Sequence, residues 1–162
     1  MTERELLEFI ESSSHVVPLE GLKPWDKALS TTLRGAHGWF SRARSPEGAM
    51  AGLWLYAGEW NRAHEVAQDL ATREGSYWHA IVHRVEPDAW NSKYWFRQVG
   101  RHPIFEELAA RAAEAGYGDG GNWDAERFVD FCVESGESGL AAAIQAVEWK
   151  LLFDYCRQGD RI

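Results

Sequence analysis

The stretch "SYWHAIVHRVEPDAWNSKYWFRQVGRHP", residues 76–103, decides the fold. Apolar side chains recur at helical spacing on both sides of Pro87, and a proline at this point interrupts a helix. Asp88 is a good N-terminal cap for the second helix, and Gly100 suits the position just past its end. The stretch therefore predicts two adjacent helices joined by a proline corner.

A second helix pair is predicted upstream. Ser45 is a good N-cap, and Pro46 suits the first helical position. Gly58 ends this helix and allows a tight reversal of the chain. Residues 60–70 then place apolar side chains on one helical face. We therefore expect an antiparallel helical hairpin here as well.

Outside these pairs the chain also predicts helices and no strands. "TERELLEFIE" begins with a capping box formed by Thr2 and Glu5. The segment "GLAAAIQAVEWKLLFDYC" is long and apolar on more than one face, which favours a central position. No alternating run of β-branched residues is long enough for a strand. We predict one all-α domain over residues 1–162, built from six to eight helices in antiparallel hairpins.

Two resemblances support a helical fold. The segment "GLWLYAGEWNRAHEVAQDL" resembles one unit of a tetratricopeptide-type hairpin, with Gly52, Gly58 and Ala63 near the points where such helices make close contact. The fold is therefore expected to be tetratricopeptide-like in part.

The second resemblance is to an uncharacterised bacterial family with a motif of the form WHAxxHRxExDxxNxxYWFRxxGxHP. It extends over about residues 52–108. It implies a shared fold and supplies no activity. The matching residues are Trp78, His79, His83, Arg84, Glu86, Asp88, Asn91, Tyr94, Trp95, Arg97, Gly100, His102 and Pro103.

Composition excludes several classes of partner. The net charge is −8 and there is no long basic run, so we expect no nucleic-acid partner and no binding to an anionic membrane surface. No run approaches the 18 apolar residues of a membrane span. The glutamate-rich first residues do not resemble a secretion signal. Cys132 and Cys156 lie in apolar surroundings and are interpreted as buried thiols, so we expect a cytoplasmic protein.

His79 and His83 form a candidate metal site. They lie four residues apart on a predicted helix, which puts both rings on one face, as two zinc ligands require. Further ligands would come from among His64, Glu59, Glu65, Glu86 and His102. The metalloprotease pattern HExxH is absent, because Ala80 follows the first histidine. The alternative is that both histidines are hydrogen-bonded packing residues.

The same helix pair offers a candidate ligand-binding wall. Arginines at such a wall would hold a carboxylate or phosphate, while tryptophans would line it. The candidate residues are His79, His83, Arg84, Asp88, Asn91, Tyr94, Trp95 and Arg97. The structural alternative is that Asp88 caps a helix with Asn91 returning a bond, and that Arg84 pairs with an acid.

These observations leave three hypotheses about function. The first is a non-catalytic module that binds a small molecule or a protein in an aromatic and polar groove. The second is a metal-dependent, hydrolase-like enzyme, with His79 and His83 as ligands of a zinc-type ion, His64 or His102 as a third ligand, and Glu86 or Asp88 as general base. The third is a homodimer with a tryptophan-rich interface. The sequence contains no phosphate-binding glycine loop and no GxSxG motif.

Overall fold

A computed structural model describes residues 1–135 and 139–159. Within these residues all regular secondary structure is helical, and loops and turns connect the helices. The all-α prediction is confirmed, although the number of helices is nine in these residues rather than six to eight. The two N-terminal helices are short, and each begins at a side-chain cap, from Thr2 or from Asp26. The helices are α1 (Glu3–Ser12), α2 (Lys27–Arg34), α3 (Pro46–Tyr56), α4 (Trp60–Asp69), α5 (Arg73–Val85), α6 (Ala89–Val99), α7 (Phe105–Ala115), α8 (Ala125–Ser135) and α9 (Gly139–Arg157).

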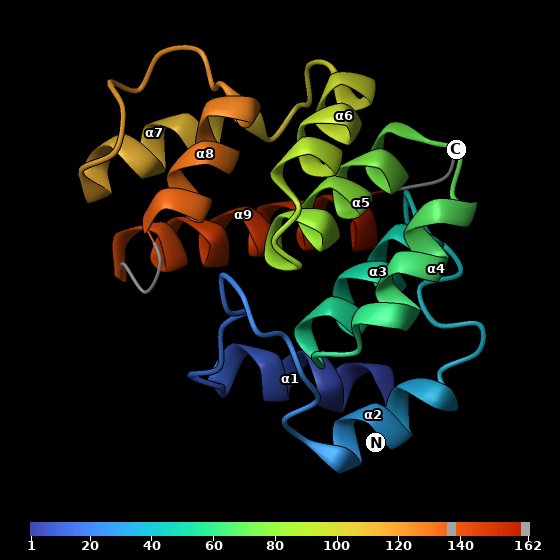
Figure 1. Cartoon of the computed structure of the whole chain (residues 1–162). Coiled ribbons are helices and arrows are strands. Elements are labelled where there is room, and N and C mark those ends of the chain that lie inside the picture. The colour runs from blue at the N-terminus through green and yellow to red at the C-terminus, as the bar shows by residue number, and fades with distance from the viewer. Residues whose placement is uncertain (136–138, 160–162) are drawn as a thin grey trace.

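Successive helices pack against one another in the middle of the chain. Helix α3 packs on α4, α4 on α5 and α5 on α6, and the connections within the α3–α4 and α5–α6 pairs are short (Figure 1). The predicted helix boundaries agree closely: the side chains of Ser45 and Asp88 accept the capping bonds expected of them. Helix α5 begins at Arg73, three residues before the predicted start, because Thr72 supplies an N-cap.

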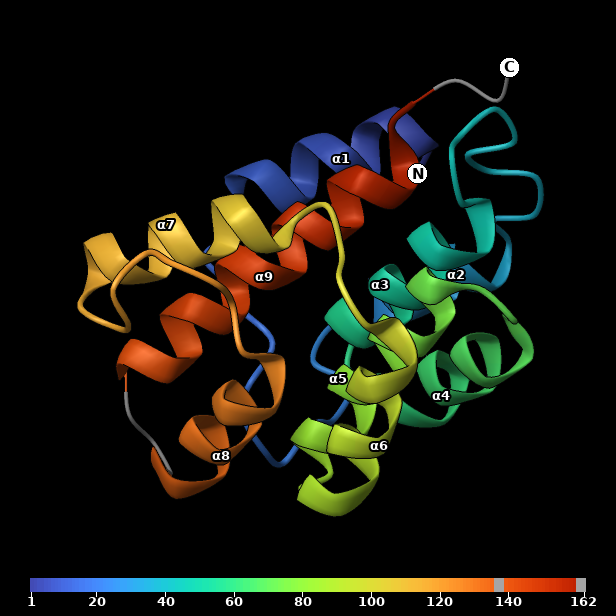
Figure 2. The ribbon, with the colours of Figure 1, turned by 90° about the horizontal axis from the view of Figure 1, so that it is seen from above.

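Helix α9 runs across the packed helices α3 to α6 and joins them to the rest of the protein. It contacts α3 near one end and α7 and α8 near the other (Figures 1 and 2). The main hydrophobic core lies where α3, α5 and α9 meet, and a smaller cluster around Leu108, Phe128 and Ile144 lies under α7 and α8. The predicted central position of this long helix is therefore confirmed. None of the helices in the described residues has an apolar stretch long enough to cross a bilayer.

Two glycines allow close approach of the backbone. A Cβ at Gly52 would lie 2.8 Å from the Trp78 ring, and the Trp149 indole donates a hydrogen bond of 2.9 Å to the Gly52 carbonyl. Gly58 has φ +81°, and a Cβ there would lie 2.0 Å from the Lys23 carbonyl oxygen. Helix α3 can therefore pack between α5 and α9 only because position 52 has no side chain.

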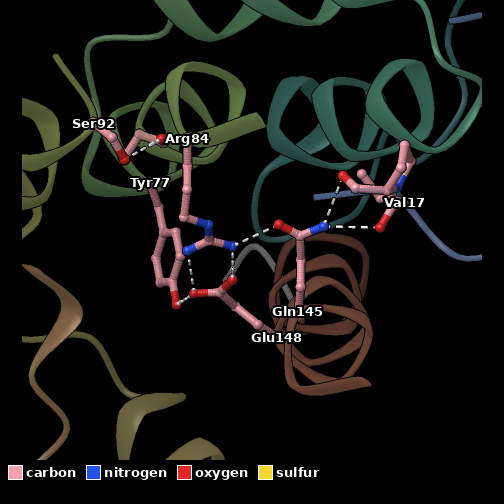
Figure 3. Close-up of polar contacts among 8 residues, drawn as sticks. Val17, Tyr77, Arg84, Ser92, Gln145 and Glu148 are labelled. Carbon is pink, nitrogen blue, oxygen red and sulfur yellow. Dashed lines mark hydrogen bonds and ion pairs between the residues drawn. The ribbon is translucent and has the colours of Figure 1, made fainter. Parts of the chain in front are cut away.

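A buried polar network ties α5 to α9 (Figure 3). The guanidinium of Arg84 pairs with the Glu148 carboxylate, and both side chains are fully buried. Tyr77 donates a hydrogen bond of 2.9 Å to the same carboxylate. Burial and the nearby carboxylate raise the pKa of Tyr77 well above its ordinary value, so the hydroxyl stays protonated and remains a donor. The network brings a cation and an anion together in the core, where neither is stable alone.

The network also reaches the loop that follows α1. Arg84 donates a 3.2 Å hydrogen bond to the Gln145 side-chain oxygen, and the amide nitrogen of Gln145 donates to the carbonyls of Val17 and Pro18 at 2.8 and 3.1 Å. The ring of Phe128 lies 4.8 Å from the guanidinium carbon, within range of a cation–π contact. Arg84 of α5 is therefore connected to α9, to α8 and, through Gln145, to the loop that follows α1.

Arg84→Ala is expected to lower the free energy of unfolding by about 3–5 kcal/mol, because it leaves the Glu148 carboxylate buried without its counter-charge. Arg97→Ala is the matched control. Its ion pair with Glu126 is solvent-exposed, so the expected loss is about 0–1 kcal/mol. Urea denaturation at pH 7 measures both values. Equal losses for the two variants would contradict the structural role of Arg84.

Candidate functional site

Three histidines from two helices meet at one place, here named the imidazole cluster: His64 of α4 with His79 and His83 of α5. Each offers a ligand nitrogen, and these nitrogens all lie within 4.8 Å of one another. The Nε2 atoms of His79 and His64 are 3.1 Å apart. The four-residue spacing within α5 places two rings on the face toward α4, and the packing of α4 on α5 supplies the third.

Tryptophan rings hold the imidazoles in place. Trp60 stacks on His64 with ring centroids 4.8 Å apart and planes inclined by 9°. Trp95 stacks on His79 at 4.0 Å and 18°. The Trp60 indole is itself fixed by a 2.9 Å hydrogen bond to the Val82 carbonyl. Ring rotation is restricted on both sides, so the geometry of the imidazole cluster is preorganised.

His64 and His79 of the imidazole cluster are neutral near pH 7. Burial, then His83 and His64, lower the pKa of His79 to about 4. Burial and His83 also lower the pKa of His64, against the opposing effect of the Glu86 carboxylate. The Nε2 atoms of His64 and His79 share one hydrogen bond, so one of them carries a proton. A metal ion binds the neutral imidazole, so neither ring has to lose a charge at neutral pH, but the shared proton has to move to an Nδ1 atom before both Nε2 atoms can bind the ion.

His83 has a buried nitrogen available for a further contact. Its Nδ1 atom has no hydrogen-bond partner in the part of the chain that the structure describes, and it lies 3.8 Å from a Glu86 carboxylate oxygen. A second possible ligand group combines this histidine with Glu86 and Asp88, again within 4.8 Å. Negative charge at the edge of the imidazole cluster favours a bound cation.

The distances fit a small transition-metal ion. Zinc–nitrogen bonds of about 2.0–2.1 Å in a tetrahedral site place two nitrogens about 3.3 Å apart, close to the 3.1 Å between His64 and His79. A nitrogen of His83 lies within 4.8 Å of both, so its ring has to move closer to complete a tetrahedral set. Three imidazoles leave one position of a tetrahedral ion open.

Except for Asp88, whose carboxylate lies within 4.8 Å of a His83 nitrogen, the other predicted site residues lie away from the imidazole cluster. Arg84 lies in the sealed core network. The Asp88 carboxylate accepts hydrogen bonds from the backbone and side-chain nitrogens of Asn91, which is the predicted capping arrangement. Tyr94 is exposed and stacks on Trp90, while Arg97 pairs with Glu126. Of the eight candidate residues, the structure groups His79, His83 and Trp95.

Of the two histidines considered as a third ligand, the structure places His64 in the imidazole cluster. His102 lies elsewhere, where its Nε2 is 3.1 Å from Glu74 and its Nδ1 accepts a hydrogen bond from the backbone of Ile104. Sequence reasoning missed the buried partners of Arg84. The available signal was a glutamine and a glutamate three residues apart, Gln145 and Glu148, in the mostly apolar first half of α9.

Comparison with known proteins adds no assignment. None of the protein-family models, curated proteins or solved structures compared with the chain matches it. The resemblances to the bacterial motif and to tetratricopeptide hairpins therefore stay predictions. The site has to be interpreted from its own chemistry.

Acidification is expected to destabilise the metal-free protein through His79. Its pKa is about 4 in the folded chain and 6.5 in the absence of structure, so the unfolded chain binds more protons between these values. The contribution of His79 to the free energy of unfolding is fully present above about pH 6.5 and is lost as the pH falls toward 4. Because one unit of pKa corresponds to about 1.4 kcal/mol, the loss is at most roughly 3 kcal/mol.

The measurement is the urea midpoint at pH 7 and pH 4.5 in a chelator, for the wild type and for His79→Gln. The variant lacks the titrating ring, so its stability should fall less between the two pH values. An identical fall in both proteins would assign the acid sensitivity to other groups.

Proposed function

We propose that this protein binds one divalent transition-metal ion, of the zinc type, through His64, His79 and His83. The observation that carries the proposal is the 3.1 Å separation of two ligand nitrogens, with a third nitrogen within 4.8 Å. The neutral rings of His64 and His79, each stacked on an indole ring, hold two of the three ligands in place for a cation.

The ligand chemistry favours zinc over harder cations. Imidazole nitrogen suits zinc, copper, nickel and iron, whereas magnesium and calcium prefer oxygen ligands. Glu86 lies at the rim and adds a negative charge near the proposed ion. Three protein ligands leave a position for water or for a further ligand.

Metal binding without catalysis is supported better than metal-dependent hydrolysis. A hydrolase needs space for a substrate beside the metal, and neither of two cavities in the described part of the chain, of about 160 and 1210 Å³, is lined by the three histidines. The hydrolase hypothesis shares the same ligands and would use Glu86 as base. The groove hypothesis loses support because Arg84, Asp88 and Arg97 are engaged with partners inside the protein.

Metal-free protein, prepared with a chelator at pH 7.5, is expected to bind zinc at one ion per chain in a calorimetric titration. His64→Gln should weaken the affinity by more than about tenfold, since even the loss of outer-shell partners costs 10–100-fold. His64 is half-buried, so the variant should remain folded. His37→Gln is the matched control, because His37 is exposed and lies outside the imidazole cluster.

Thermal unfolding gives an independent measurement. Zinc at about 100 times its dissociation constant adds about 2.7 kcal/mol to the stability of a single-site protein. For a chain of this length that corresponds to a rise in Tm of roughly 5–10 °C. The rise should be absent in His79→Gln. The absence of stoichiometric zinc binding by the wild type, or unchanged affinity in His64→Gln, would overturn the proposal.

A further inference from the structure

Two carboxylates lie beside His83 at the end of α5, and their situations differ. Glu86 and Asp88 each place an oxygen within 4.8 Å of a His83 nitrogen. The Asp88 carboxylate accepts hydrogen bonds from the backbone and side-chain nitrogens of Asn91, at 3.1 and 2.6 Å, so its oxygens are engaged at the start of α6. The Glu86 side chain is 40% exposed and forms no other ion pair in the part of the chain that the structure describes. Of the two acids, Glu86 is therefore the one available to His83.

The end of α5 holds Glu86 in this position. The His83 carbonyl accepts backbone hydrogen bonds from Glu86 at 3.3 Å and from Asp88 at 2.6 Å, and these close the last turn of the helix. Glu86 keeps helical backbone angles, with φ −63° and ψ −39°. Residues three apart on a helix share a face, so the Glu86 carboxylate returns to the edge of the His83 ring. One of its oxygens lies 3.8 Å from the Nδ1 atom of that ring.

The His83 ring has little freedom to turn away from this carboxylate. It stacks on His79 with centroids 4.9 Å apart and planes inclined by 26°, and it makes an edge-to-face contact with Trp60 at 6.0 Å. The residue is 8% exposed, and its Nδ1 atom is buried without a hydrogen-bond partner among the described residues. The nitrogen that faces Glu86 is therefore Nδ1, which leaves Nε2 as the free nitrogen of the ring.

A bound ion decides where the proton of this imidazole lies. A neutral imidazole carries one proton, and in the absence of an ion that proton can occupy either nitrogen. An ion at Nε2 requires the proton to be on Nδ1. A buried N–H group without an acceptor costs free energy, and the Glu86 carboxylate 3.8 Å away is placed to accept its hydrogen bond. Metal binding therefore creates the need for a hydrogen bond that the metal-free chain does not have to make.

We propose that Glu86 is a positioning residue of the metal site: the ion binds His83 through Nε2, and the Nδ1–H group donates a hydrogen bond to the Glu86 carboxylate. This inference rests on the proposed function, because it assigns both nitrogens of one ligand in that site. A histidine that binds a metal ordinarily donates its other ring N–H to such a partner, which fixes the tautomer and raises the basicity of the ligand. A movement of about 1 Å by the exposed Glu86 side chain shortens the present 3.8 Å to hydrogen-bond distance.

Calorimetric titration of the full chain with zinc at pH 7.5 tests this role. Glu86→Ala removes the acceptor and should weaken zinc binding by about 10–100-fold, the usual cost of losing such a partner. Glu86→Gln keeps an oxygen acceptor without the charge, so its affinity should lie between those of Glu86→Ala and the wild type. Asp69→Ala is the matched control and should bind zinc like the wild type, because Asp69 is an exposed acid at the end of α4, outside both ligand groups.

Two further measurements separate positioning from a purely structural role and from direct coordination. The Tm of metal-free Glu86→Ala should stay within about 2 °C of the wild type, because the exposed side chain contributes little to the stability of the metal-free chain. Cobalt takes the place of zinc and reports the ligand set through its visible absorption. At saturation with cobalt, Glu86→Gln and the wild type should show the same absorption bands, because the carboxylate bonds His83 and not the ion.

The outcomes distinguish this inference from the proposed function. A wild type that binds no zinc would overturn both, whereas zinc binding by the wild type with unchanged affinity in Glu86→Ala would overturn the inference alone. Equal losses in Glu86→Ala and Glu86→Gln, or an equal loss in Asp69→Ala, would show that charge matters and the hydrogen bond does not. Displaced cobalt bands in Glu86→Gln would make Glu86 a ligand, and a clear fall in the metal-free Tm of Glu86→Ala would make its role structural. Each of these results would also overturn the inference.

Discussion

The buried ion pair between Arg84 and Glu148 is the constraint on which the rest of the structure depends. A guanidinium in the core is tolerated only when a carboxylate meets it with good geometry and when the remaining donors are used. Glu148 and Gln145 meet most of that requirement from one helix. The register of α9 against α5 is therefore set by charge, and the apolar contacts around it have to conform.

Helix α5 carries both this ion pair and two members of the imidazole cluster. Helix α5 is buried over most of its length. Its Tyr77 and Arg84 side chains face α9, whereas His79 and His83 contact the His64 ring of α4. The imidazole cluster and the ion pair thus occupy different faces of one helix. On the other side of the pair, α9 contributes Ala146, Trp149 and Lys150 to the lining of a cavity of about 160 Å³. A shift of α9 along α5 would disturb the ion pair and this lining together.

The sequence predicts the local features well and the long-range ones poorly. The helix pair around Pro87, the Asp88–Asn91 cap and the shared face of His79 and His83 follow from spacing and side-chain chemistry within one turn of helix. The burial of Arg84 does not, because its counter-charge lies 64 residues away. Hydrophobic periodicity does not indicate which distant acid an arginine will pair with. The sequence therefore predicts Arg84 at a ligand-binding wall, whereas the structure places it in the core.

The 64 residues of sequence between Arg84 and Glu148 also affect how the chain folds while it is being made. The ribosome adds about 5–20 residues per second, so Arg84 precedes Glu148 by roughly 3 to 13 seconds. During that interval the guanidinium has no carboxylate to accompany it into the interior, and hydration holds it outside. The core around Arg84 therefore cannot reach its final form until α9 is made. A chain that ends before α9 lacks both Gln145 and Glu148, and its α5 then has an uncompensated charge on the face that α9 covers.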